Sequence, residues 1–235
     1  MKEKIMLKSA VHSKESLLVA LLLAMNTGFV DAFTFFHFDG RFASLQTGNL
    51  IQTGINLAHG NLEKAFQFII PILFFALGAL FKTLFTKYKT QNNQSEIESL
   101  LFIQMIGILL ISLAFATFLH LSASLFVGIL SFFMVIQGDT FTRVRGLPYA
   151  NIMSTGNIKA FGTNLGQYLV SKNTKDLKNS LIFLSLALSF VVGAFISSLL
   201  SLWLGDFTLI GSSLLILLAY YSYKIIIHKK QRLFH

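Results

Sequence analysis

Six long apolar segments constrain the fold of this 235-residue chain more than any other feature. Each is close to the roughly 20 apolar residues that a helix needs to cross the hydrocarbon core of a bilayer. Hydrophobic residues make up 54% of the chain and charged residues only 12%, a composition that few soluble folds share. We place the predicted spans at Leu17–Phe38, Ala65–Phe85, Leu100–Leu119, Leu121–Thr142, Asn179–Leu204 and Phe207–Ile227. The sequence therefore predicts an all-α integral membrane helical bundle with six transmembrane helices.

The first apolar segment follows four lysines, as the core of a secretory signal would. It is long, it contains Asn26 and Asp31, and it lacks a clear small-residue cleavage site. We therefore interpret it as a helix of the mature protein.

The formal net charge of +9 comes from residues that flank the apolar segments, where Lys and Arg set membrane orientation. We therefore expect a lipid bilayer as the surrounding partner and no nucleic acid. The chain has no cysteine, which excludes a disulfide framework, a thiolate metal site and a cysteine nucleophile.

The two halves of the chain resemble each other after a shift of 108 positions. Nine of the 27 aligned positions from 31 to 57 are then identical, where ordinary residue frequencies would give about two. The Thr-Gly-Asn triplet at 47–49 falls on the one at 155–157. We predict one membrane domain over 1–235 with internal repeats at approximately 16–119 and 121–228.

The orientation depends on whether the two Thr-Gly-Asn segments cross the bilayer. If neither crosses, each half has three spans, and 17 of the 19 Lys and Arg residues lie on the cytoplasmic side together with both termini. If both cross, five of these basic residues move outside and Lys159 lies within a span. The positive-inside bias favours six crossings, and the two repeats are then inverted relative to each other.

Each Thr-Gly-Asn triplet begins a short polar segment that suits a half-helix or re-entrant helix. We expect Thr47 and Thr155 to act as N-caps, because a threonine hydroxyl accepts a hydrogen bond from a free first-turn amide. Gly48 and Gly156 would let a solute approach the backbone closely. The positive end of each helix dipole would attract an anionic group or a carbonyl.

Amide side chains follow at helical spacing in both segments. Asn49 and Asn56 fall on one predicted face, and Asn157 and Asn164 repeat them in the second half. We expect these amides to supply hydrogen bonds to a solute. Amphipathic helices that lie in the membrane interface are the alternative, with the amides facing lipid headgroups.

Asp31 and Asp139 occupy equivalent positions late in the first and fourth spans. A carboxylate within a membrane often marks a proton, ion or substrate pathway. Solvation at a helix end, or pairing of Asp139 with Arg143 or Arg145, is the structural alternative. Asn26 and Gln137 precede the two aspartates and are expected to form hydrogen bonds between helices.

The sequence resembles the YoaK-like family of bacterial multi-pass membrane proteins over nearly its whole length. The resemblance rests on "MNTGFVDAFTFF", "TGNLIQTGINLA" and "GLPYANIMSTGNIKAFG", and its most specific parts are residues 28–32 and the two Thr-Gly-Asn triplets. It implies a protein of the bacterial inner membrane. It carries no assigned activity, and hence no catalytic or substrate residues.

These observations favour a small-solute or ion transporter or channel whose site is formed by the two half-helices. No sequence motif of a serine hydrolase, a P-loop, a zinc protease or a dinucleotide-binding fold is present, so we expect no enzyme, cofactor or metal. A membrane scaffold or sensor that binds another membrane protein is the alternative, and a membrane enzyme is a weaker one. Homo-oligomerisation is compatible with all three.

Overall fold

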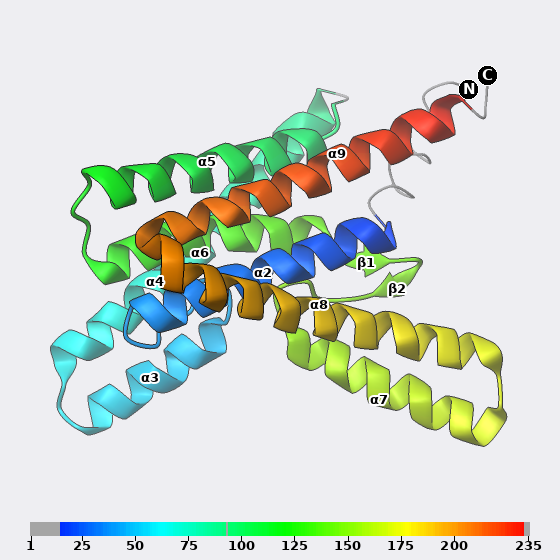
Figure 1. Cartoon of the computed structure of the whole chain (residues 1–235), viewed down its shortest axis with the longest axis horizontal. Coiled ribbons are helices and arrows are strands. Elements are labelled where there is room, and N and C mark those ends of the chain that lie inside the picture. Colours follow the sequence, from blue (N-terminus) through cyan, green and yellow to red (C-terminus); the bar gives the residue numbers. More distant parts are fainter. Residues whose placement is uncertain (1–14, 93, 233–235) are drawn as a thin grey trace.

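The computed structural model describes residues 15–92 and 94–232, and almost all of them are helical (Figure 1). The lysines before the first predicted span lie outside these residues. The helices are α2 Leu17–His37, α3 Gln46–Ala58, α4 Leu62–Gln91, α5 Ile97–Thr117, α6 Ala123–Thr140, α7 Ser154–Ser171, α8 Thr174–Leu204, the 3₁₀ turn η1 Gly205–Leu209 and α9 Ile210–Arg232. The short strands β1 Arg143–Val144 and β2 Leu147–Pro148 form a hairpin between α6 and α7.

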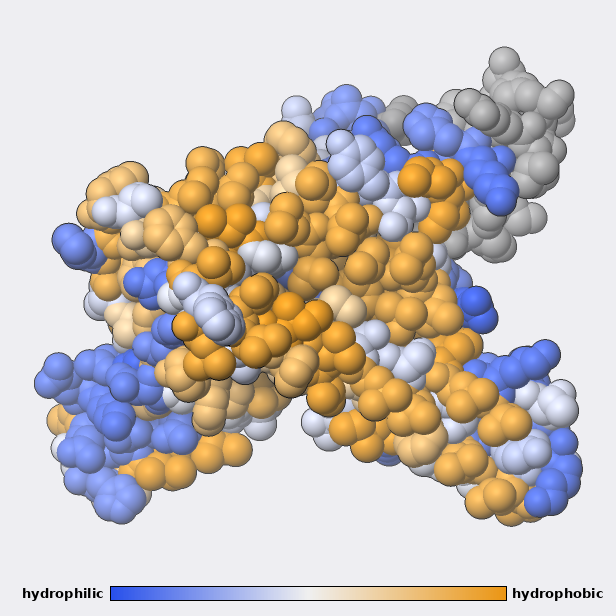
Figure 2. All heavy atoms as spheres, in the orientation of Figure 1, coloured by the Kyte–Doolittle hydropathy of each residue, from blue (hydrophilic) through white to orange (hydrophobic). Residues whose placement is uncertain are grey.

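Five described segments are long and apolar enough to cross a membrane. Four are the helices α2, α4, α5 and α6, and the fifth, Thr174–Lys229, contains α8 and most of α9. Figure 2 shows a largely hydrophobic surface over the long helices and hydrophilic residues at the tips of the molecule. The length and apolar surface of these helices indicate a multi-pass membrane protein, as the sequence predicts.

The long helices pack in pairs that join the first part of the chain to the second. Helix α2 packs against α8 and α9, α6 packs against α4 and α5, and α5 packs against α9. The two short helices have fewer neighbours, since α3 packs mainly on α4 and α7 mainly on α8. These two pairs form hairpins that project from the bundle in different directions (Figure 1).

Glycines allow the closest helix crossings. A Cβ atom added at Gly28 of α2 would lie 2.0 Å from the carbonyl oxygen of Phe190, and one at Gly193 of α8 would lie 1.9 Å from that of Met25. In the α4–α6 pair, a Cβ atom at Gly78 would lie 2.5 Å from the carbonyl oxygen of Phe132. Small residues let helix backbones touch, which strengthens packing where no hydrophobic effect drives association.

The β1–β2 hairpin departs from the purely helical prediction. Its two turn residues, Arg145 and Gly146, have positive φ angles of 48° and 82°, as tight two-residue hairpins require. Glu15, just before α2, accepts a hydrogen bond from the Gly146 backbone N–H at 2.7 Å and pairs with Arg143 at 3.2 Å. The hairpin is thereby tied to the start of the first membrane helix.

Candidate functional site

A buried carboxylate holds the loop that leads into α3. Asp31 on α2 is only 4% exposed, and one of its oxygens accepts the backbone N–H of Ser44 at 2.8 Å. The other oxygen accepts the Ser44 hydroxyl. Because Asp31 lies more than a helical turn before the end of α2, the loop of residues 38–45 must fold back along the bundle to reach it.

The same serine meets the loop that precedes α7. The Ser44 hydroxyl oxygen lies 3.4 Å from the carbonyl oxygen of Ile152. Positions 44 and 152 differ by 108, the shift that relates the two halves of the sequence. We call the contact of Asp31, Ser44 and Ile152 the junction. Next to it, the Gln46 side chain donates a hydrogen bond of 3.3 Å to Ser131 at the middle of α6, so α3 begins at mid-bundle depth.

Asp139 has a different environment from Asp31, although the shift aligns them. Its side chain is exposed and makes no hydrogen bond or ion pair within residues 15–92 and 94–232. The alternative pairing of Asp139 with Arg143 does not form there, since Arg143 binds Glu15 instead. The position equivalent to Ser44 is Ile152, which has no hydroxyl to offer a carboxylate. The structure therefore brings only Asp31 of the two aspartates to the junction.

The predicted capping role of the threonines is wrong. Helix α3 begins at Gln46 and α7 at Ser154, so Thr47 and Thr155 lie inside the first turns. The N-cap residues are Leu45 and Met153, and neither gives a side-chain cap. Both threonine side chains are exposed, and the first-turn amides of the two helices are left without a side-chain partner.

The two glycines of the Thr-Gly-Asn triplets, Gly48 and Gly156, have different surroundings. A Cβ atom at Gly48 would lie 2.8 Å from the ring of Phe42, so that ring occupies the space beside Gly48. Nothing lies within 4 Å of a Cβ atom at Gly156. Of the two triplet glycines, only Gly156 therefore has open space next to its backbone.

The predicted amide stripe is present, but it faces protein. Asn49, Asn56 and Asn157 are buried, and Asn164 is half-buried. All four side chains donate to backbone carbonyls, Asn49 to Phe42 O, Asn56 to Gln52 O, Asn157 to Ala150 O and Asn164 to Ala160 O, at 2.7–2.9 Å. The acceptors also match after the 108-residue shift.

One amide of the four has a buried acceptor without a partner. The Oδ1 of Asn49 accepts the backbone N–H of Phe42 at 3.1 Å. The Oδ1 of Asn157 is buried and has no hydrogen-bond partner. A buried acceptor without a hydrogen-bond partner is costly. The polar groups at the start of α7 are therefore less completely hydrogen-bonded than those at the start of α3. Nearby, burial raises the pKa of Tyr149 well above its usual range, which keeps this phenol protonated.

A buried polar network lies at the centre of the bundle and was found only in part from the sequence. Gln137 of α6 accepts from Asn26 at 2.9 Å and from Gln104 at 3.2 Å. Its Nε2 lies 3.0 Å from Oδ1 of Asn151, which precedes α7, and Ser212 of α9 donates to Asn26 at 2.7 Å. The contacts predicted for Asn26 and Gln137 are confirmed, and they are made with each other.

Three members of this network were not predicted from the sequence: Gln104, Asn151 and Ser212. Gln104 carried a usable signal, because it stands alone in the apolar run "LLFIQMIGILL". Its Oε1 is buried without a partner. Asn151 had no comparable signal, since loops are commonly polar.

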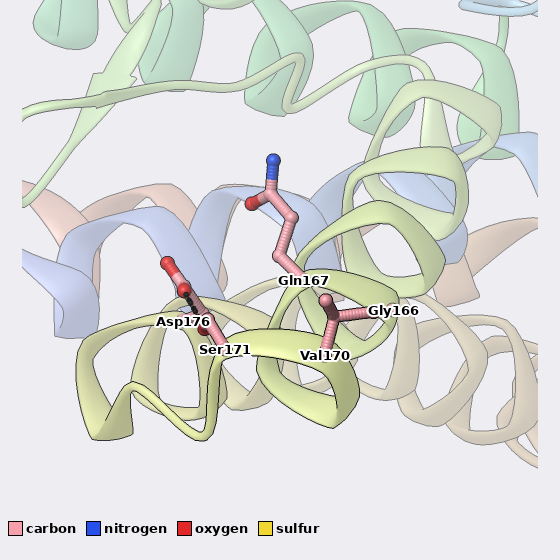
Figure 3. A pocket seen from close by; sticks show the side chains of 5 residues that line it. All are labelled: Gly166, Gln167, Val170, Ser171 and Asp176. Atoms are coloured by element: carbon pink, nitrogen blue, oxygen red, sulfur yellow. Dashed lines mark hydrogen bonds between the residues drawn. The ribbon is translucent and has the colours of Figure 1, made fainter.

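Two open hollows lie at the tips of the hairpins and away from the junction. One, of about 630 Å³, lies where α7 meets α8 (Figure 3) and is lined by Gly166, Gln167, Val170, Ser171 and Asp176. Figure 3 shows Ser171 joined to Asp176 by a hydrogen bond, with Gln167 extending away from this pair. The other, of about 710 Å³, lies where α3 meets α4 and is lined by Asp39, Gly60, Asn61, Leu62, Glu63, Lys64 and Gln67.

No group of three or more metal-binding side chains occurs in the described ranges. Asp39 binds Arg41, and His59 contacts the carbonyl of Ile55 on its own helix.

A family described as a protein of unknown function, DUF1275, matches residues 19–222. This match includes α2 through most of α9 and both Thr-Gly-Asn triplets. Comparison with curated proteins and comparison with solved structures each find no match. The YoaK-like resemblance is consistent with this family match. A match over most of its length shows that the chain belongs to the DUF1275 family.

Proposed function

We propose that this protein is a small-solute or ion transporter or channel of the bacterial inner membrane, with six spans in two inverted repeats. The spans are α2, α4 and α5 in the first half, and α6, α8 and α9 in the second. Helices α3 and α7 are re-entrant half-helices that enter from opposite sides. Transporters with this architecture form their site where the discontinuous helices meet.

The packing supports the repeat. Exchanging α2 with α6, α4 with α8 and α5 with α9 converts the α2–α8 pair into α6–α4, and the α2–α9 pair into α6–α5. The same exchange converts the α3–α4 pair into α7–α8. Contacts between equivalent residues, such as Ser44 with Ile152 and Ser213 with Met105, are those expected beside a two-fold axis.

The observation that carries the functional proposal is the buried Asp31 carboxylate at the junction of the two loops. A carboxylate within a membrane helix is costly and usually functional. Both oxygens of Asp31 depend on Ser44, so a change of charge on Asp31 would alter the position of the first loop. Asp31 is the proposed charge-bearing group, and the uncapped starts of α3 and α7 supply N–H donors.

The amides have a different role in this proposal from the one that the sequence suggested. Asn49, Asn56 and Asn164 donate to backbone carbonyls and hold the half-helices in shape. Asn157 combines this role with a free Oδ1 next to the open backbone of Gly156. The solute would therefore meet the α7 end of the site through Asn157 rather than through a full stripe of amides.

The inverted topology can be tested by cysteine labelling, because the chain has no native cysteine. Single cysteines at Asn61 and Asn173 would mark the α3–α4 and α7–α8 tips. In intact cells, an impermeant maleimide should label N61C from outside and should reach N173C only after permeabilisation. Labelling of both from the same side would contradict the inverted repeat.

Transport can be tested in vesicles that contain the purified protein. We expect flux of protons or of a small solute, followed with a pH-sensitive dye or by light scattering. Asp31→Asn should lower the flux about tenfold or more, whereas Asp139→Asn should leave it nearly unchanged. Equal effects of the two substitutions would remove the support for a site at Asp31.

A scaffold that binds another membrane protein is the second candidate, and one observation favours it. Nothing lies within 4 Å of a Cβ atom at Gly54, Gly162 or Gly166, so α3 and α7 have open small-residue surfaces. Such surfaces permit close contact with a partner helix or a second copy of the chain. Absence of flux together with a stoichiometric co-purifying membrane protein would support this function.

A further inference from the structure

The hollow at the tip of the α3–α4 hairpin lies beside a buried cation. Two of the side chains that line it, Asp39 and Gln67, contact the guanidinium of Arg41. Arg41 itself is 1% exposed, and its guanidinium carbon lies 5.0 Å from the centre of the Phe68 ring. An arginine so placed is fixed in position by stacking and hydrogen bonds.

The charge of Arg41 is poorly compensated. Its Nη1 donates to the carbonyl oxygen of Phe38 at 2.9 Å, and Gln67 is neutral. Its Nε is buried without a hydrogen-bond partner. The carboxylate partner is Asp39, at 3.2 Å, whose side chain is 75% exposed. A buried cation is costly unless an anion is held firmly against it, and a carboxylate that is mostly in water does this weakly.

Asp39 can leave without disturbing the core. It stands at a φ of 50° and Gly40 at 75°, so a tight turn, not packing, brings its carboxylate to Arg41. On departure of this side chain, one edge of the guanidinium would face the hollow. That edge matches a planar carboxylate, which can accept two parallel hydrogen bonds.

We propose that this hollow binds a small monocarboxylate, which replaces the Asp39 carboxylate on Arg41. Lys64 at the rim attracts the anion, and Glu63 beside it disfavours a more highly charged one such as a phosphate dianion. The site is separate from the junction and does not depend on the transport proposal. It belongs to the first half alone, because position 149, the equivalent of Arg41, is a tyrosine.

The test is a titration of the full-length purified protein with sodium acetate, with sodium chloride at matched ionic strength as the reference. Binding is followed by the rise in the thermal unfolding temperature. Asp39→Asn removes the internal competitor and should strengthen acetate binding about tenfold, which corresponds to about 1.4 kcal/mol. Arg41→Gln should abolish the saturable response.

The hollow at the α7–α8 tip supplies a matched control. Asp176 lines it and is bonded to Ser171, and within the described residues Asp176 forms no ion pair with an arginine, unlike Asp39. Asp176→Asn should therefore leave acetate binding unchanged. An equal gain in D39N and D176N, or no gain in D39N, overturns the proposal.

Two comparisons keep the result unambiguous, one between variants and one between anions. If Arg41→Gln fails to fold, the comparison of D39N with D176N still decides, because both replaced side chains are at the surface. Inorganic phosphate at mildly alkaline pH should bind more weakly than acetate. Tighter binding of phosphate than of acetate would overturn the assignment to a carboxylate.

Discussion

At the scale of single residues, the interior of this bundle is marked by polar groups that satisfy one another across the chain. Gln137 joins α6 to α2, α5 and the loop before α7, and Ser44 joins the first loop to Asp31. Hydrocarbon offers no alternative partner to these groups. Each therefore fixes the relative position of the elements it connects.

Replacing Gln137 with leucine should destabilise the protein strongly. It leaves Asn26, Gln104 and Asn151 with unpaired buried atoms, each of which costs about 1–3 kcal/mol. We expect a clear fall in the thermal unfolding temperature of Gln137→Leu in detergent. Gln167→Leu, on the exposed surface of α7, is the matched control and should change little. Similar falls in both variants would argue against a stabilising network.

Replacing Ser44 with alanine should weaken the attachment of the first loop. The hydroxyl donates to a carboxylate, and hydrogen bonds to charged groups are worth about 1.5–3 kcal/mol. Ser44→Ala should lower the unfolding temperature and increase proteolysis within residues 38–45. The exposed Ser171→Ala should do neither, and unchanged cleavage in Ser44→Ala would contradict a role for this contact.

At the scale of elements, the length of the apolar segments predicts where the helices lie. Glycines then determine how closely these helices cross. The six predicted apolar segments coincide with the helices α2, α4, α5, α6, α8 and α9 to within a few residues at most ends. The larger differences are at the polar ends of α4, α8 and α9, because helices continue beyond the apolar segment that hydropathy detects. Gly28 and Gly193 then determine how closely α2 approaches α8.

Replacing Gly193 with alanine should push α2 and α8 apart. The added methyl would lie 1.9 Å from a backbone oxygen that cannot rotate away, and overpacking of this kind costs about 1–3 kcal/mol. Gly162→Ala, in open space on α7, should instead gain about 0.5–1 kcal/mol of helix propensity. Thermal unfolding of the two variants would test this, and equal shifts would contradict the close crossing.

The sequence could not place the contacts that connect elements. Asp31 was identified because a carboxylate within an apolar segment is unusual. Ser44 and Arg41 lie in a loop, where polar residues are ordinary, and their importance comes from partners that the fold supplies. The predicted starts of α3 and α7 differ from the observed ones for the same reason. Tertiary contacts of Gln46 and Asn151 decide where the loops before these two helices end.

At the scale of the whole molecule, the two parts of the chain on either side of residues 118–122 share one core. The pairs α2–α8, α4–α6 and α5–α9 each take one helix from either part. Within the first part, by contrast, the main pair is α3–α4. Most of the packing among membrane helices therefore crosses between the parts.

Fragments 1–120 and 121–235 should consequently be unstable when produced separately and should associate when produced together. Each fragment alone would leave the glycine-lined faces of its long helices without the helix that covers them. Joint purification of the two fragments through a tag on one would test this. A single fragment that is folded and monodisperse by itself would contradict it.

The interlocked helices have a consequence for how the protein is made by the cell. Helix α2 leaves the ribosome long before α8 and α9, the helices against which most of its buried surface packs. During that interval the buried Asn26 lacks its final partners, Gln137 of α6 and Ser212 of α9. The early spans must therefore be held in the membrane by the insertion machinery, or by one another, until the last helices of the chain arrive.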